Sequence, residues 1–371
     1  MFQVGVMAYM RVAVLAMVLI LTACGSSSAP QAQSSSQPSA TPTNATAEAT
    51  SPTPSPNLAA LCRIPLSWTD TSVPNSLGQE GFIDLTTGKV TDVPAAHLVI
   101  SPTNPNLQES PGSPVLIGNA PRGSSYYDVP LGRWLPTLGE WISPDGAQYL
   151  YVDGAELHVV TVATGADRVL VGGKSLYPLA WTPDHIYVMD AFRGLPVQTY
   201  SLSLSSGVLT KLGAELGAPV PVFGTGAWVT DVSPTLPHAN SPQYGAIANR
   251  ISRIDLNSGK TVEWFSAAKA TVALVGFTQS GTALIESTTS AGTVLVRLTT
   301  PDNVVETYAL PQPASETGGS SLQVTDAHGT WLLDQKGEVF IYNEGAAPKL
   351  LATAPARDTL SLELDGGCAP R

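Results

Sequence analysis

Beyond residue 57 the chain repeats one short pattern of apolar and polar positions. The pattern is a hexad, apolar-x-apolar-x-x-Gly, in which apolar residues alternate with other residues and a glycine closes the segment. Alternation with a period of two is typical of a strand, and a glycine after turn residues is typical of a hairpin, so each hexad predicts a strand end, a turn and the next strand. Clear copies, followed by two weaker ones, occur at residues 83–88, 160–165, 202–207, 254–259, 340–345, 127–132 and 296–301.

The spacing of these copies predicts the fold. Successive copies lie about 43 residues apart on average, inside the period of roughly 40 to 50 residues that marks the blades of β-propellers. The 33 glycines and 31 prolines of the chain, with little helical periodicity, favour an all-β protein. We therefore expect residues 58–371 to form an all-β, seven-bladed β-propeller of four-stranded blades, and a count from six to eight fits the same spacing.

A second turn precedes several of the hexads. Its clearest copy is Ser143-Pro144-Asp145-Gly146, and related segments occur at residues 181–184 and 277–281. At these residues the chain resembles the WD40-like and TolB-type β-propellers, whose blades carry an S-P-D-G turn between their first and second strands. The resemblance implies a propeller over the whole region after residue 57, and it implies no particular activity.

The two ends of this region carry the features that a ring needs for closure. If residues 63–68 and 81–87 are the second and third strands of the first blade, its first strand is missing at the N-terminus, and residues 359–364 can supply it. We expect the ring to close through this C-terminal strand and through a disulfide between Cys62 and Cys368. Two unpaired buried thiols are the alternative.

Residues 1–23 have the pattern of a secretory signal peptide. Arg11 precedes an apolar run, residues 12–23, that is too short to span a bilayer as a helix. The run ends in Leu21-Thr22-Ala23-Cys24, which resembles a bacterial lipobox and implies that Cys24 is lipidated and becomes the mature N-terminus. A buried N-terminal strand with a free thiol is the alternative. The start codon is left open among Met1, Met7 and Met10.

Residues 24–57 are rich in Ser, Thr, Pro and Ala and carry one charge, Glu48. Such a composition buries too little apolar surface to offset the entropy of ordering, so we expect a disordered tether with a reach of roughly 30 Å. The predicted organisation is therefore a lipoprotein signal peptide, a tether and a propeller, held through the lipid on the extracytoplasmic face of a bacterial cell envelope.

The net charge and the absence of known motifs limit the kinds of partner and reaction that the chain can be expected to have. With 18 Lys+Arg against 29 Asp+Glu, the chain has a net charge of −11 and lacks the basic footprint of a nucleic-acid partner. No two of the five histidines have the spacing of a metal site, and no G-x-S-x-G elbow or phosphate-binding loop is present, so we expect no metal, no cofactor and no catalytic residues. Asp145, Asp184 and Asp326 fall near first-to-second turns, where Asp stabilises the turn itself.

Strand parity divides the predicted propeller into two faces. Turns between first and second strands and between third and fourth strands lie on one face, which we call the turn face, and the remaining connections lie on the loop face. The tether joins a second strand, so the turn face is expected toward the membrane and the loop face, with the longest loops, away from it. The candidate ligand-binding residues of the loop face are Arg122, Phe192, Arg193, His238, Tyr244 and Lys336.

These loop residues bring cations and rings to an otherwise acidic protein, and they could recognise an anionic or glycan ligand. We therefore expect a non-catalytic module that binds an extracytoplasmic protein, peptide or glycan. The alternative is an exported propeller enzyme, a lyase or glycan hydrolase, which needs carboxylates or histidines that converge at the outward mouth of the central channel.

Overall fold

The structure is a computed structural model. It describes residues 57–70, 79–96, 99–100, 107–109, 116–118, 125–183, 185–191, 196–237, 240–241, 245–310, 323–334, 336–354 and 360–371. The described residues all belong to one compact unit, Pro54–Arg371. Within these ranges there is no helix with the length and apolar character that crossing a membrane requires.

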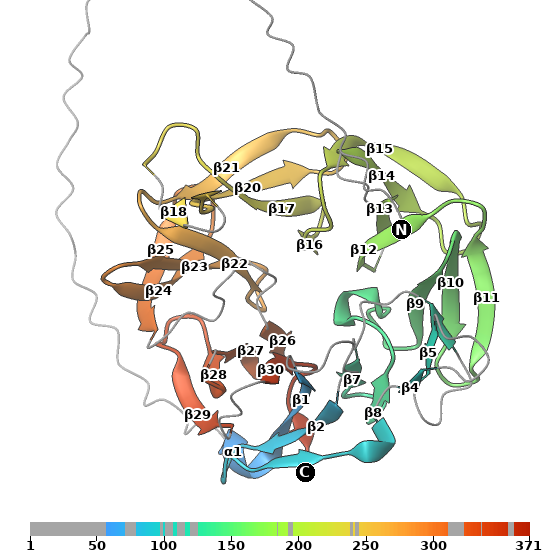
Figure 1. The fold of residues 1–371 in the computed structure, drawn as a ribbon, viewed down its shortest axis with the longest axis horizontal. Helices are drawn as coiled ribbons and strands as arrows, with labels where there is room; N and C mark the ends of the chain where they lie inside the picture. Colours follow the sequence, from blue (N-terminus) through green and yellow to red (C-terminus); the bar gives the residue numbers. More distant parts are fainter. Residues whose placement is uncertain are drawn as a thin grey trace, which may run out of the picture. The chain divides into compact units, whose positions relative to one another are not determined.

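Six antiparallel sheets follow one another around a central axis in the described part of the chain (Figure 1). The first sheet is formed by β30 (Leu360–Leu364), β1 (Cys62–Asp70), β2 (Gln79–Asp84) and β3 (Val90–Asp92), and the second by β9 (Gln148–Asp153), β10 (Glu156–Thr161) and β11 (Ala166–Val171). The third is formed by β12 (Leu176–Trp181), β13 (Ile186–Asp190), β14 (Val197–Leu202) and β15 (Leu209–Leu216).

The remaining three sheets also have four strands each. The fourth contains β16 (Val222–Phe223), β17 (Gly226–Asp231), β20 (Arg250–Asp255) and β21 (Thr261–Ser266), and the fifth contains β22 (Thr271–Phe277), β23 (Ala283–Thr289), β24 (Gly292–Leu298) and β25 (Val304–Leu310). The sixth contains β26 (Gln323–Asp326), β27 (Gly329–Leu333), β28 (Glu338–Tyr342) and β29 (Lys349–Thr353). Short elements complete the described part: α1 (Leu58–Leu61), η1 (Pro94–Ala96), η2 (Gly139–Trp141), the hairpin of β18 (Asn240–Ser241) with β19 (Gly245–Ala246), and β31 (Ala369–Pro370).

The all-β propeller is confirmed, but the prediction of seven blades is wrong, because the described residues form six. The hexad at residues 127–132 is the turn of a two-stranded hairpin, β7 (Tyr126–Asp128) with β8 (Arg133–Leu135), and not part of a blade. The strands before it are β4 (Val99–Ile100), β5 (Leu107–Glu109) and β6 (Leu116–Gly118), which make a small sheet of their own. Residues 101–123 contain five prolines, which cannot donate to a ladder of hydrogen bonds, so strands of blade length are disfavoured there.

The other hexads form the predicted turns, each between the third and fourth strand of a sheet or, in the second sheet, between its last two. Gly88 and Gly259 have φ angles of 68° and 72°, which a residue with a Cβ rarely adopts. A Cβ on Gly88 would lie 2.6 Å from the carbonyl oxygen of Thr353, and a Cβ on Gly259 would lie 2.5 Å from that of Gly213, each in the neighbouring sheet. The glycine of the hexad therefore serves both the turn and the close approach of adjacent sheets.

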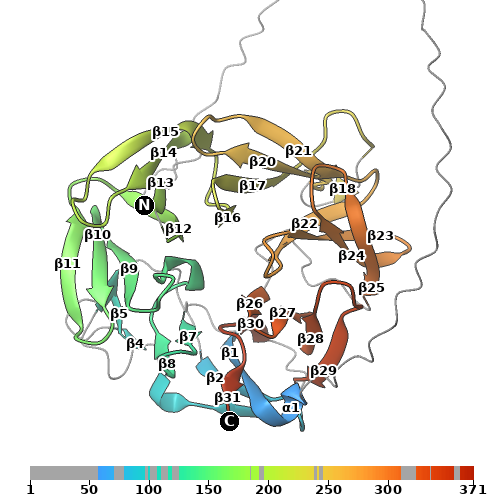
Figure 2. The same ribbon diagram turned by 180° about the vertical axis from the view of Figure 1, so that it is seen from behind.

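The C-terminal segment pairs with the first sheet. Strand β30 lies antiparallel to β1, with Leu364 opposite Leu66, and so occupies the innermost position that the sequence left vacant. Strand β31 pairs with the start of β1, and Figure 2 shows the two beside α1. Cys62 and Cys368 form a disulfide with a Cα–Cα distance of 5.1 Å, as predicted.

Apolar side chains fill the spaces between adjacent sheets. One cluster joins the first sheet to the sixth, with Ile64 and Leu66 packed near Trp331 and Leu333. Trp141 and Trp331 are fully buried and Trp181 is partly buried, and all three belong to these clusters. Because each sheet is covered on both sides, chemistry is left to the turns at the two faces.

Candidate functional site

A pocket of about 450 Å³ opens where turns of the first, second and sixth sheets meet the β7–β8 hairpin. We call it the turn pocket. It is lined by residues from the segments 126–130, 139–146, 324–328 and 367–368. The segment 143–146 precedes β9 and the segment 327–328 joins β26 to β27, so both are first-to-second connections and the pocket lies on the turn face. The site is therefore not on the face from which binding was expected.

The S-P-D-G segment builds one wall through its own hydrogen bonds. The Ser143 hydroxyl donates to Oδ1 of Asp145 at 2.7 Å, and the same carboxylate oxygen accepts the N–H of Ala147 at 3.0 Å. The N–H of Gln148 donates to the Ser143 hydroxyl oxygen at 2.9 Å. These bonds hold Asp145 in the turn, as predicted. The hydrogen bond from the Ser143 hydroxyl, and then the one from the N–H of Ala147, lower the pKa of the Asp145 carboxyl.

Asp326 forms the opposite wall and joins two parts of the chain. Its Oδ1 accepts the N–H of His328 at 2.7 Å, within its own turn. Its Oδ2 accepts the N–H of Cys368 at 2.6 Å, in the C-terminal segment. The predicted turn role is confirmed, and the structure adds that one carboxylate ties the sixth sheet to the end of the chain.

Carboxylates surround the floor of the pocket near Tyr126. Burial, and then the negative charges of Asp128, Asp365, Asp326 and Glu140, raise the pKa of the Tyr126 hydroxyl. Burial also raises the pKa of Asp128, although its Oδ1 accepts the N–H of Leu131 at 2.8 Å. The residues that line the pocket, all within the described part of the chain, include no lysine and no arginine. The site is consequently negative and holds no balancing cation of its own.

Two glutamates extend this negative region. Glu140 lies in η2 beside the lining residue Gly139, and Glu363 lies in β30, the innermost strand of the first sheet. Both side chains reach solvent, yet desolvation by the surrounding protein raises the pKa of each. Burial raises the pKa of Asp365 well above its ordinary value, and the charges of Glu363 and Glu80 act in the same direction.

The polar groups of the pocket that could be catalytic are engaged in turns. Both oxygens of Asp326 accept backbone N–H groups, and the Ser143 hydroxyl is paired with Asp145 rather than with a histidine. A hydrolytic pair needs a nucleophile in hydrogen-bond reach of a base. Among the described residues that line the pocket, no hydroxyl or thiol forms a hydrogen bond with a histidine. The carboxylates of Asp128 and Asp326 give the same lining its negative charge.

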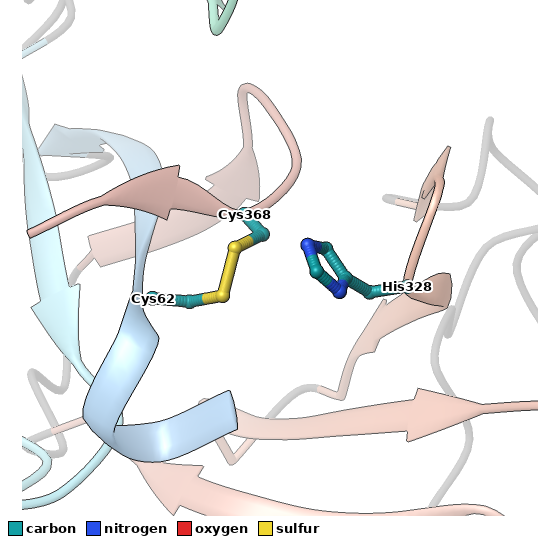
Figure 3. A group of neighbouring side chains, drawn as sticks. All are labelled: Cys62, His328 and Cys368. Carbon is teal, nitrogen blue, oxygen red and sulfur yellow. A yellow bond between two sulfur atoms is a disulfide. The ribbon is translucent and has the colours of Figure 1, made fainter. Parts of the chain in front are cut away.

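One edge of the pocket is formed by the disulfide. Cys368 and His328 both line the turn pocket and are partly exposed, whereas Cys62 is fully buried behind them. Figure 3 shows the imidazole of His328 beside the two sulfur atoms, across the gap between the sixth sheet and the C-terminal segment. The sequence predicted the pairing of Cys62 with Cys368 but not the approach of His328, because no pattern along the chain relates His328 to either cysteine.

The residues expected to bind ligand can be placed only in part. Lys336 is exposed in the turn between β27 and β28, which is the end of β27 away from His328 and hence on the loop face, as predicted. A role for Lys336 in binding stays a prediction. Cys24, the predicted lipidation site, and the other five candidates lie outside the described residues: Arg122, Phe192, Arg193, His238 and Tyr244. Asp184 lies outside them as well.

Sequence reasoning missed Tyr126, Asp128, Glu140 and Glu363 as site residues. A signal for part of the site was present, since strand parity gathers first-to-second turns on one face and Asp128 lies within a hexad. No sequence pattern marks the two glutamates, because only the meeting of separate segments brings Glu140 near Tyr126 and Glu363 near Asp365.

Comparisons with known proteins show similarity in fold. No protein-family model matches the chain, and no curated protein matches it. Several solved structures, in contrast, match the chain. TolB from Acinetobacter baumannii is 11% identical, with a TM-score of 0.40, over 82% of this chain and 67% of that one.

Two other solved structures align over similar shares of the chain. The acylaminoacyl peptidase of Pyrococcus horikoshii is 11% identical over 74% of this chain and 43% of that one, with a TM-score of 0.38. A protein from Lactobacillus plantarum is 12% identical over 81% and 99%, with a TM-score of 0.38. TolB-type propellers are thus among the structures similar to this β-propeller, and no activity is transferred from any of them.

Proposed function

We propose that this propeller is a non-catalytic binding module that holds a basic peptide segment of a partner protein in the turn pocket. The observation that carries the proposal is the unbalanced negative charge of that pocket: carboxylates surround Tyr126, and the described residues that line the pocket include no lysine or arginine. A ligand with a lysine or arginine side chain supplies the missing charge and forms charge-assisted hydrogen bonds.

The size and the lining of the pocket favour a peptide over a glycan. About 450 Å³ accommodates one or two side chains rather than a folded surface. The aromatic side chains among the described lining residues are Tyr126 and His328. Sugar recognition commonly stacks several aromatic rings against the apolar face of the sugar.

The proposal includes attachment to a bacterial cell envelope through a lipid on Cys24, followed by a tether to residue 57. Closure of the propeller by β30 and by the Cys62–Cys368 disulfide brings both ends of the folded region to the turn face. Thr86, in the β2–β3 turn, donates its hydroxyl to the carbonyl of Ala59 at 2.9 Å, and Arg371 contacts Asp84 of the same turn at 2.7 Å. A tether reach of roughly 30 Å leaves room for a partner between the membrane and the pocket.

Attachment is tested by replacing Cys24 with Ala. The variant is expected to remain uncleaved by a lipoprotein signal peptidase and to lose lipid-dependent partitioning into detergent. An unchanged mass and unchanged partitioning would show that Cys24 is not the anchor, and the binding module would then have to be held by other means.

Peptide binding is tested with a fluorescent ten-residue peptide of alternating lysine and glycine and with fluorescence anisotropy. Glu140→Gln removes a charge that acts on Tyr126, and Glu363→Gln removes one that acts on Asp365. Each is expected to weaken binding about fivefold, or about 1 kcal/mol. The matched control is Glu215→Gln, which removes the same charge from an exposed position in the outermost strand β15.

The Glu215→Gln control distinguishes binding in the turn pocket from a general attraction of the basic peptide to the acidic protein surface. If the acidic surface as a whole attracts the peptide, all three variants weaken binding equally, and the proposal fails. Binding that is unaffected by Glu140→Gln and Glu363→Gln but is lost on changes of the loop face would move the site to that face.

A further inference from the structure

The Cys62–Cys368 disulfide and His328 form a cluster that the proposed peptide binding does not use. The two sulfur atoms and a ring nitrogen of His328 all lie within 4.8 Å of one another (Figure 3). Among the described residues this is the one group of three or more His, Cys, Asp or Glu side chains with ligand atoms so close together. In the oxidised protein the sulfurs are bonded to each other and are poor ligands for a cation.

We propose that reduction of this disulfide converts the cluster into a thiolate–imidazole metal site with Cys62, Cys368 and His328 as ligands. Two thiolates and one imidazole are the donors that Zn²⁺ prefers, and three protein ligands with one open position are typical of sites that keep a place for water or an external ligand. The inference does not require the peptide proposal, because its ligands are the two cysteines and His328, although the cluster opens into the same pocket and Asp326 belongs to both.

The geometry supports this because bonds other than the disulfide hold the ligands together. Cys62 lies opposite Pro370 in the β1–β31 pairing, and the N–H of Arg371 donates to the carbonyl of Leu61 at 3.3 Å. On the other side of Cys368, Leu364 pairs with Leu66. The two cysteines are thus bracketed by strand pairing, and opening the S–S bond leaves them neighbours.

The third ligand is held to the second by Asp326. Its carboxylate accepts the N–H of His328 at 2.7 Å and the N–H of Cys368 at 2.6 Å, so one side chain fixes the backbone of both. Because both backbones are already fixed, less conformational entropy is lost when the two side chains gather around an ion. The sulfurs have only to turn about their Cα–Cβ bonds to separate and face the imidazole.

Access to the site comes from the turn pocket. Cys368 and His328 line it and are partly exposed, whereas Cys62 is fully buried. A reductant therefore meets the Cys368 sulfur first, and the open position of a bound ion faces the pocket.

The chemistry balances with a reductant of named class. A phosphine and one water convert the disulfide into two thiols, and the phosphine becomes its oxide; in the protein's environment a dithiol would do the same and be oxidised to a disulfide. Binding of a divalent ion then displaces one proton from each thiol.

The test uses Co²⁺, whose absorption reports thiolate ligands and tetrahedral geometry. The purified protein is reduced with a phosphine, freed of it without oxygen and titrated, while circular dichroism follows strand content. The expected result is one Co²⁺ per reduced chain with thiolate charge-transfer bands, displacement by Zn²⁺, and no such spectrum for the oxidised protein.

Variants identify the ligands. His328→Ala is expected to lower the affinity of the reduced protein for Co²⁺ at least about tenfold, which is the scale of losses seen even for outer partners of metal ligands. The matched control is His185→Ala, which removes an exposed imidazole from the β12–β13 turn of the third sheet and leaves the affinity unchanged. A Cys62→Ser/Cys368→Ser variant is expected to lose the charge-transfer bands.

Three outcomes would overturn the proposal. Absence of Co²⁺ bands in the reduced, folded protein excludes the site. Equal affinities of the His328→Ala and His185→Ala variants show binding to the thiols alone. Loss of strand content on reduction shows that the β1–β31 pairing and Asp326 do not hold the ligands together, and the premise then fails.

Discussion

Two groups of acidic side chains in this propeller differ in whether a cation of the protein balances their negative charge. This difference distinguishes a structural cluster from a candidate binding site. In the fifth and sixth sheets, Glu306 accepts a hydrogen bond from Nε of Arg297 at 3.0 Å and one from the Tyr342 hydroxyl at 2.6 Å. The N–H of Gly345 adds a third at 3.0 Å. We call these residues the Glu306 cluster.

The pKa values follow from these partners. Desolvation by itself would raise the pKa of Glu306, but the hydrogen bonds from Arg297, Tyr342 and Gly345 outweigh it and lower the pKa to about 2. Burial raises the pKa of Asp128 in the turn pocket, and desolvation raises the pKa of Glu140 and of Glu363, which lie outside the pocket lining. Among the described residues, no cation contributes to any of these three shifts. The Glu306 cluster is complete within the fold, whereas the pocket leaves its charge for a ligand to balance.

The largest expected effect is on the Glu306 cluster. Arg297→Met leaves Glu306 without its cation at a side chain only 12% exposed, and it is expected to cost about 2 kcal/mol in the free energy of unfolding at pH 7. Because the pKa of Glu306 is lowered on folding, its contribution is present above about 4.5 and is lost as the pH falls toward 2.

Urea unfolding of the wild type and of Arg297→Met across pH 2 to 7 measures this, and the gap between the two is expected to close in acid. The Arg297→Met/Glu306→Gln variant serves as control, since removal of both charges should cost less than removal of the arginine alone. A gap that is independent of pH would mean that packing, and not charge, accounts for the loss.

A smaller effect on the free energy of unfolding, of opposite sign, is expected at Glu363. The pKa of Glu363 is raised on folding, so its ionisation costs stability as the pH rises above its unfolded value near 4.5. Glu363→Gln is therefore expected to stabilise the protein at pH 7 by a few tenths of a kcal/mol, discounted because the side chain still reaches solvent. The gain should vanish near pH 4, and destabilisation by Glu363→Gln at pH 7 would contradict the assignment of Glu363 to an unbalanced negative region.

The smallest effect is expected for a change on the loop face, which tests the contrast between the two faces. Lys336→Ala removes an exposed cation of the loop face and is expected to change neither the unfolding free energy nor the affinity for the lysine–glycine peptide by more than about 0.5 kcal/mol. Anisotropy and urea unfolding measure both. A marked gain in peptide affinity would show that the peptide lies near Lys336, and the loop face would then be the binding face.

Local structure was predictable from sequence because it depends on neighbours in the chain. The hexads and the S-P-D-G segment predicted hairpin turns, since glycine at positive φ and Asp beside a turn act within a few residues. The blade count failed at residues 127–132 for the same reason. A hexad marks a turn, whereas the number of strands in a sheet depends on what pairs with the hairpin, and the prolines of residues 101–123 remove donors that such pairing needs.

By itself the sequence determined the strand period, the all-β class, the pairing of the C-terminal strand with the first sheet and the Cys62–Cys368 disulfide, because few other partners were available to those segments. Only the tertiary structure decided the site. Cys62 and Cys368 are 306 residues apart in the chain, and His328 joins them from the neighbouring sheet. The approach of His328 to the disulfide, like that of Tyr126 to Glu140 and Asp365, depends on the positions of whole sheets around the axis, which packing between sheets sets and spacing along the chain does not encode.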